Sequence, residues 1–247
     1  MLNLVAKSTS KTRDGLNSLY LQIFAKKNKK VLDVIKKVHN EYLSYLETDA
    51  LWELAQVAII NEQKQVNGII VEAGCALGGS AIALASAKSK SRKFFTYDVF
   101  GMIPPPSEKD DRDVHERYLT IASGKSVGLG EQLYYGYENN LYEKVLRNFQ
   151  RFGFDIRENN IHLIKGLYED TLKIDSPVSL AHIDCDWFES VWICLQRIEP
   201  YLVTGGTLVI DDYYAWSGCK RAVDEYFKDK KDCYQFLSKK RLHIVKN

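Results

Sequence analysis

Apolar residues along this chain form two kinds of pattern. Some occur in short continuous runs, which are typical of buried strands, and others recur at helical spacing over longer segments. Strand-like runs occur at 68–72, 93–97, 161–164, 178–184 and 207–210. Helical segments alternate with them at about 79–89, 139–153, 188–200 and 217–229. Such alternation indicates a mostly parallel sheet that is covered on both faces. Two last runs, at 234–238 and 242–246, predict an antiparallel hairpin at one edge, so we expect an α/β, doubly wound, seven-stranded sheet.

The chain before the first strand has a different pattern. Helical spacing at about 21–37 and 49–63 predicts two helices that cover an edge of the sheet or the ligand cleft. Residues 1–20 show no periodicity and are expected to be partly disordered or to form an arm onto a partner subunit. We therefore divide the chain into an N-terminal part, 1–66, and a main domain, 67–247.

A long polar insert at 101–136 separates the second strand from the next helix. It contains three consecutive prolines, a charged stretch and several glycines, and it begins beyond the carboxyl end of the strand at 93–97. A loop of this length inside a compact domain is typical of a lid or a binding loop. Its aromatic residues either line a substrate pocket or pack the loop itself, and they are Tyr118, Tyr134, Tyr135 and Tyr137.

The charges are close to balanced, with 34 basic and 32 acidic residues in 247 and a formal net charge of +2. Such a balance creates no field for nucleic acid or for an anionic membrane, so we expect neither as a partner. The five cysteines are odd in number and form no C-x-x-C pair, which indicates reduced thiols rather than disulfides or a structural zinc site. Because no apolar leader or membrane-spanning run is evident, a cytoplasmic protein is expected.

A glycine-rich turn joins the first strand to its helix, in the order Glu72-x-Gly74-x-x-x-Gly78-Gly79-Ser80. The dinucleotide fingerprint is G-x-G-x-x-G, and it has no place for the acid that precedes the first glycine. A carboxylate there suits a ligand with an ammonium group, and the helix N-terminus suits a carboxylate. S-adenosylmethionine (AdoMet) carries both groups. The alternative is a turn whose glycines serve packing alone.

Asp98 ends the second strand, at the separation from the glycine turn where an acid binds ribose hydroxyls in nucleotide-binding sheets. A carboxylate that accepts from both hydroxyls would recognise the ribose of adenosine and repel a 2′-phosphate. The alternative is an aspartate that caps a helix or stabilises a turn.

Acidic residues end two further strands. Asp184 closes the run at 178–184, and Asp211 and Asp212 follow the run at 207–210. Because ligands bind at the carboxyl ends of parallel strands, we expect the three side chains to share one rim. Oxygen ligands without a His or Cys cluster suit a hard cation, Mg²⁺ before Ca²⁺ or Mn²⁺. The alternative is that one or two of them cap the following helices.

Asp186, two residues beyond Asp184, is expected beside that rim and is the first candidate for a general base. His182 and His115 are weaker candidates, because a lone histidine on a buried strand is more often a packed, hydrogen-bonded residue. A cation at the rim would lower the pKa of a substrate hydroxyl and hold its oxygen in line with a methyl group.

Together these motifs resemble the macrocin O-methyltransferase (TylF-type) family of class I AdoMet-dependent methyltransferases, over about 68–227. The turn at 72–80 is similar to the family's AdoMet loop, and 98–104 to its ribose loop, with one residue fewer before the glycine. The segment 166–172 matches its G-x-[FY]-x-D-T-L motif. The resemblance implies the class I fold with its closing hairpin. It also implies AdoMet contacts at Glu72, Ala73, Gly74, Cys75, Gly79, Ser80, Asp98, Val99, Phe100, Gly166, Tyr168 and Asp184.

By the same resemblance, Mg²⁺ would bind Asp184, Asp211 and Asp212, and Asp186 would be the base. We expect an AdoMet- and Mg²⁺-dependent O-methyltransferase that acts on a hydroxyl of a small specialised metabolite, sugar-bearing or peptide-derived. One alternative is an NAD-dependent oxidoreductase, which the glycine spacing and the carboxylates disfavour. Another is a non-catalytic, AdoMet-binding partner subunit. Members of the family often self-associate, which leaves a homo-oligomer open.

Overall fold

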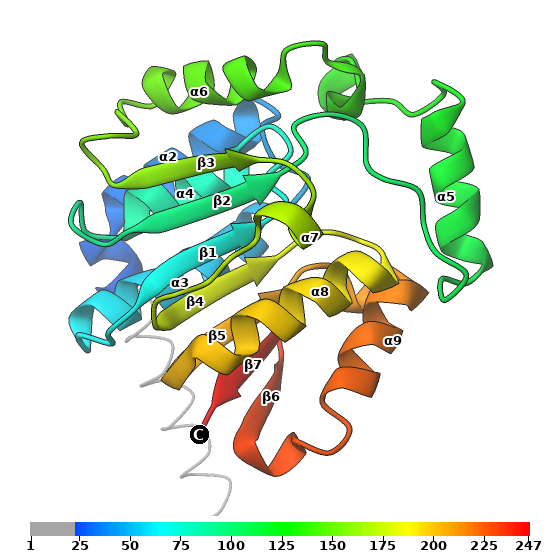
Figure 1. The fold of residues 1–247 in the computed structure, drawn as a ribbon. Coiled ribbons are helices and arrows are strands. Elements are labelled where there is room, and N and C mark those ends of the chain that lie inside the picture. The colour runs from blue at the N-terminus through cyan, green and yellow to red at the C-terminus, as the bar shows by residue number, and fades with distance from the viewer. Residues whose placement is uncertain (1–22) are drawn as a thin grey trace, which may run out of the picture.

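The computed structural model describes residues 23–247, and the arm expected at 1–20 lies outside the described residues. Seven strands form one sheet in the order β3-β2-β1-β4-β5-β7-β6 (Figure 1). Among the strands of the described residues, β7 alone runs antiparallel to its neighbours, β5 and β6. The predicted doubly wound sheet and its closing hairpin are therefore confirmed. The strands are β1 (Ile69–Ala73), β2 (Phe94–Asp98), β3 (Ile161–Lys165), β4 (Val178–Ile183), β5 (Leu202–Ile210), β6 (Tyr234–Ser238) and β7 (Leu242–Lys246).

Helices cover both faces of this sheet (Figure 1). The α-helices are α2 (Lys29–Asn40), α3 (Thr48–Gln63), α4 (Gly79–Ala87), α5 (Arg112–Ala122), α6 (Leu141–Arg151), α7 (Tyr168–Thr171), α8 (Phe188–Ile198) and α9 (Ser217–Tyr226). The short 3-10 helices of the described residues are η1 (Leu129–Glu131), η2 (Tyr135–Tyr137), η3 (Glu199–Tyr201), η4 (Asp212–Tyr214) and η5 (Lys231–Cys233). Among the described residues, no helix has both the length and the apolarity that a membrane span needs. All five cysteines are free thiols.

Alternation along the strands divides the apolar residues between two cores. Ile70, Leu180 and Val209 face the core that contains α2, α3, α4 and α6. Val71 and Ala181, each one residue further along, face the core under α8 and α9. Because successive strand side chains point to opposite faces, Glu72 and His182 lie on the same face as Ile70 and Leu180. This alternation decides where both polar residues are buried.

The two N-terminal helices share the first core with the sheet. Helix α2 packs on α4, and α3 packs on α4, β4 and β5. The connection between α2 and α3 touches the start of α4, where the Gly79 N–H donates to the Leu43 carbonyl oxygen at 3.0 Å. A Cβ at position 79 would lie 2.3 Å from that oxygen, so only glycine permits the approach. The boundary drawn at 66/67 stays a prediction.

The insert at 101–136 contains a helix that was not predicted. Helix α5 lies beyond the carboxyl ends of the strands (Figure 1), with Val114 and Ile121 buried on one side. These are two apolar positions in a charged segment, a weak pattern that the sequence hides. Two aspartates fasten the helix: Asp110 accepts from the Phe188 N–H at 2.8 Å, and Asp113 accepts from the Ser217 N–H at 3.0 Å.

Candidate functional site

A cavity of about 460 Å³ opens at the carboxyl ends of the parallel strands. The loops after β1, β2, β4 and β5 form its floor, and the insert contributes to its walls. This is the position at which open α/β sheets bind their ligands. Residues of the cavity wall include Leu43, Tyr45, Gly74, Cys75, Ala76, Ser80, Asp98, Val99, Arg117, Tyr134, Tyr135, Tyr168, Asp184, Asp186, Trp187, Asp211, Asp212, Trp216, Lys240 and Arg241.

The glycine turn meets the end of β4 inside this cavity. Gly74 has a φ of +88°, and a Cβ there would lie 1.7 Å from the Asp184 carbonyl oxygen. Only glycine, which has no Cβ, therefore allows the backbone of Asp184 to lie this close to the turn. Cys75 and Ser80, both predicted AdoMet contacts, line the cavity, and so does Ala76.

The carboxylate of Asp98 holds two loops together. Its Oδ2 accepts from the N–H groups of Cys75 at 2.8 Å and Ala76 at 3.1 Å. Its Oδ1 accepts from the Phe100 N–H at 2.6 Å. Burial raises the pKa of Asp98, and these three N–H donors oppose the rise. A carboxylate has about four acceptor positions, so about one remains for a ribose hydroxyl.

Several residues predicted to bind AdoMet do not line the cavity. The carboxylate of Glu72 is completely buried, with Oε1 at 3.1 Å from His182 Nδ1 and Oε2 at 3.5 Å from Thr96 Oγ1. The expected contact with an ammonium group is therefore not supported, because strand alternation turns Glu72 under α3 and α4. Phe100 packs edge-on against Tyr142. The other residues that lie off the cavity wall are Ala73, Gly79 and Gly166.

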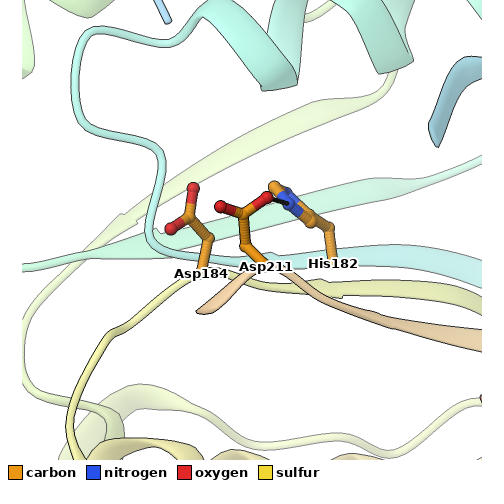
Figure 2. A group of neighbouring side chains, drawn as sticks. All are labelled: His182, Asp184 and Asp211. Atoms are coloured by element: carbon orange, nitrogen blue, oxygen red, sulfur yellow. Dashed lines mark hydrogen bonds and ion pairs between the residues drawn. The ribbon is translucent and has the colours of Figure 1, made fainter. Parts of the chain in front are cut away.

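The acidic strand ends do come together. Asp184, Asp186, Asp211 and Asp212 all line the cavity. Ligand atoms of His182, Asp184 and Asp211 lie within 4.8 Å of one another, and Figure 2 shows these side chains rising from adjacent strands. The third predicted ligand, Asp212, lines the cavity beside this group, and its Oδ2 accepts from the Asp186 N–H at 3.1 Å. The assignment of Asp184, Asp211 and Asp212 as metal ligands stays a prediction.

The charges of this cluster fit a divalent cation. Burial raises the pKa values of Asp184 and Asp212, and the negative charges of neighbouring aspartates raise them further. Two positive groups oppose that repulsion at Asp211: His182 Nε2 lies 3.5 Å from Oδ1, and Arg241 Nε donates to the same oxygen at 2.8 Å. Four clustered carboxylates face these two cations, so oxygen ligands are present for Mg²⁺, and a bound cation would relieve the repulsion that raises these pKa values.

Asp186, rather than a histidine, has the properties of a general base. Burial and the charge of Asp211 raise its pKa to about 6, and its φ of 58° is a strained conformation of the kind found at functional sites. Burial alone would lower the pKa of His182, but hydrogen bonds to Asp211 and Glu72 raise it to about 10. His182 also lies off the cavity wall, with a carboxylate facing each ring nitrogen, so the geometry favours Asp186 over His182, and the choice of base stays a prediction. His115 is exposed on α5, outside the cavity wall.

Parts of the cavity were not predicted. Arg241 reaches it from the turn between β6 and β7. The connection 43–47 reaches it from the N-terminal helices, which were expected over the sheet edge or the ligand cleft but without any named residue. Neither segment has a motif that could have pointed to the site. Trp187 and Trp216 also line the cavity, and their nearness to the acidic motifs was an unused signal.

The tyrosines of the insert divide between the two expectations. Tyr134 and Tyr135 line the cavity. The Tyr137 hydroxyl instead donates to the Ile121 carbonyl oxygen at 2.6 Å and therefore packs the insert. Tyr118 lies outside the cavity wall.

Comparison with known proteins agrees with this geometry. The demethyldecarbamoylnovobiocin O-methyltransferase of Streptomyces niveus is 30% identical over 168 residues, which is 65% of this chain and 58% of that protein. A tetracenomycin-C 4′-O-methyltransferase of Streptomyces olivaceus is 29% identical over 167 residues, again 65% of this chain and 58% of that protein. This chain thus matches less than two thirds of the length of either relative.

A solved structure and a family model extend the comparison. The structure of the O-methyltransferase NovP superposes with a TM-score of 0.69 at 22% identity, covering 83% of this chain and 82% of that one. The likeness in structure supports the class I methyltransferase fold. The sequence model of the macrocin O-methyltransferase (TylF) family matches residues 48–239, most of the chain. With the glycine turn, Asp98 and the acidic strand ends in place, this protein therefore belongs to the macrocin O-methyltransferase (TylF) family.

Proposed function

We propose that this protein transfers the methyl group of AdoMet to a hydroxyl of a small natural product, in a reaction that depends on Mg²⁺. One observation carries the proposal: the glycine turn after β1 and the acidic ends of β4 and β5 line the same cavity. The residues proposed for the methyl donor and those proposed for the cation therefore face one space, where binding brings the reacting groups together. Membership of a methyltransferase family removes the oxidoreductase alternative.

The donor site is proposed on the wall formed by the first two strands. Cys75, Val99 and Tyr168 provide its surface, and Ser80 adds a hydroxyl. The remaining acceptor position of Asp98 is assigned to the ribose. The same carboxylate also holds the loops after β1 and β2 together. Donor affinity therefore depends on Asp98 both through the ribose contact and through the shape of these loops.

A natural-product acceptor is supported by the other wall and by the relatives. Tyr134, Trp187 and Trp216 offer aromatic surface, and Arg117 of α5 adds a positive charge beside the Tyr134 ring, 5.7 Å from its centroid. The two relatives are named for demethyldecarbamoylnovobiocin and for a rhamnosyl tetracenomycin. We therefore propose a glycoside or a peptide-derived product as the acceptor class.

Asp186 is the proposed base. It lines the cavity beside the acidic strand ends, and a pKa of about 6 lets it be ionised at neutral pH while it remains basic enough to accept a proton. Asp184 and Asp211, with Asp212 beside them, would hold Mg²⁺. When bound, Mg²⁺ supplies a positive charge that lowers the pKa of a substrate hydroxyl.

Label transfer from methyl-labelled AdoMet tests the proposal. The protein is incubated with a panel of glycosylated and peptide-derived phenols and sugars, with Mg²⁺ or with a chelator, and products are identified by mass spectrometry. We expect transfer that requires Mg²⁺ and that Asp186→Asn strongly reduces. Equal transfer in chelator would remove the metal from the proposal. AdoMet binding without transfer to any acceptor would instead favour the non-catalytic partner subunit.

A further inference from the structure

A line of polar side chains crosses the buried face of the sheet toward the acidic cluster. Glu72 on β1 and His182 on β4 are 0% exposed, and Asp211, directly after β5, is 9% exposed. Glu72 Oε1 lies 3.1 Å from His182 Nδ1, and His182 Nε2 lies 3.5 Å from Asp211 Oδ1. Neither Glu72 nor His182 lines the cavity, so neither can touch a substrate there.

The register of the sheet creates this line. Glu72 pairs with Thr96 on one side and with His182 on the other, and His182 pairs with Val209 on β5. Asp211 follows Val209 by two residues, so strand alternation would direct it to the same face. Because both ring nitrogens of His182 have carboxylate partners, the orientation of the ring is defined from both ends (Figure 2 shows the contact with Asp211).

Asp211 is held at one oxygen from two directions. Its Oδ1 faces His182 and also accepts from Arg241 Nε at 2.8 Å. The Arg241 guanidinium is in turn paired with Glu47 at 3.3 Å. With Oδ1 occupied in this way, Oδ2 is the oxygen of Asp211 that is left for a ligand in the cavity.

Stability alone does not account for the buried pair. Two polar partners buried side by side contribute little net stability, and an apolar pair of similar volume is often as stable. A hydrogen-bonded chain that ends on a carboxylate ligand does, however, fix the direction of that ligand. The line ends on Asp211, whose ligand atoms lie within 4.8 Å of those of Asp184.

We propose that Glu72 and His182 are positioning residues that orient Asp211 and thereby set the affinity of the acidic cluster for its divalent cation. The inference rests on the metal site of the proposed function. It assigns Glu72 to the metal side of the cavity rather than to the methyl donor. His182 acts through Asp211 and is not itself a ligand of the cation.

Mn²⁺ binding, followed by electron paramagnetic resonance, tests the inference without any acceptor. Glu72→Gln and His182→Gln should each weaken Mn²⁺ binding about 10- to 100-fold. Affinity for S-adenosylhomocysteine, measured by calorimetry, should stay within about twofold of wild type. The matched control is His243→Gln, since His243 is equally buried, lies in the same row of the sheet beside Val209, and has no partner at Nε2. Circular dichroism verifies that each variant is folded.

The possible results distinguish a failure of the positioning role from a failure of the proposed function. The positioning role would be overturned if Glu72→Gln and His182→Gln both bound Mn²⁺ as tightly as His243→Gln does. It would also be overturned if the wild-type protein bound no Mn²⁺. A directly coordinated ring nitrogen in the pulsed spectrum of the wild type would also overturn it, because His182 would then be a ligand. If Mn²⁺ binding responds as expected but no acceptor is methylated, the proposed function fails and the positioning role stands.

Discussion

The carboxylate of Asp98 offers the sharpest test of how the donor site is built. Asp98→Asn keeps the shape of the side chain but replaces one carboxylate oxygen with an NH₂ group. In the wild type, three N–H groups, those of Cys75, Ala76 and Phe100, point at the two oxygens. An amide has one oxygen with two acceptor positions, so at least one N–H loses its partner and faces another donor.

The expected loss follows from these contacts. A hydrogen bond to a charged group contributes about 1.5–3 kcal/mol, and a buried N–H left without a partner costs about 1–3 kcal/mol. Because the loops can relax around the substituted side chain, we expect the free energy of donor binding to weaken by about 2–4 kcal/mol in total. At 1.4 kcal/mol for each factor of ten, Kd for S-adenosylhomocysteine should rise about 30- to 700-fold.

Calorimetry measures this change, and Asp155→Asn is its control. Asp155 also accepts from two backbone N–H groups, those of Arg157 at 2.8 Å and Glu158 at 3.0 Å, but it lies on an exposed turn outside the cavity. The control should bind like wild type. A Kd for Asp98→Asn within about threefold of the control would refute the reasoning, because the loops would then hold their shape without the carboxylate.

The ribose contact of Asp98 can be separated from its role in the loops. Wild-type protein should bind adenosine more tightly than 2′,3′-dideoxyadenosine if the remaining acceptor position binds a ribose hydroxyl, as proposed. In Asp98→Asn the preference should shrink. An equal preference in both proteins would assign Asp98 to the loops alone.

Three further substitutions test other parts of the structure. Gly79→Ala places a Cβ 2.3 Å from the Leu43 carbonyl oxygen, so the midpoint of thermal unfolding should fall by about 4 °C or more; an unchanged midpoint would contradict this packing. Asp211→Asn should lower Mg²⁺-dependent turnover by about 100-fold in a label-transfer assay and leave donor binding intact; full activity would exclude a metal role. Glu199→Gln should make the free energy of unfolding fall less steeply as the pH is lowered. Burial opposes ionisation of Glu199, but hydrogen bonds, including one from Lys230, lower its pKa below the 4.5 of the unfolded chain. Its contribution to stability is therefore present above about pH 4.5 and lost below it. Equal loss of unfolding free energy in both proteins on acidification would refute the last expectation.

Residue order alone predicted the sheet and its cavity-facing acids. Alternating strands and helices imply parallel strands whose carboxyl ends meet, and Asp98, Asp184, Asp186 and Asp211 were placed correctly at that edge because each ends a strand or follows one closely. Glu72 has the sequence position expected for an ammonium contact, but the structure buries it on the face of β1 that packs under the helices, off the cavity wall. Position along a chain does not say which of two faces carries the ligand.

The insert illustrates a second limit. Prolines, glycines and charges dominate it, yet α5 forms inside it because Val114 and Ile121 are buried and Asp113 is bound to Ser217 more than one hundred residues later. Local pattern was too weak to predict this helix, since the contacts that stabilise it are long-range. The position of the insert over the cavity, by contrast, followed from its place after the second strand.

The sequence by itself determined the succession of strands and helices, the glycine turn and the acids at the strand ends, since these depend on periodicity and on residue type over a few positions. Only the tertiary structure decided which partners those groups meet. Strand order sets β4 between β1 and β5, so His182 lies between Glu72 and Asp211, with a carboxylate facing each ring nitrogen. The return of the chain after β6 brings Arg241 to the same carboxylate, a contact across 30 residues that no local pattern encodes.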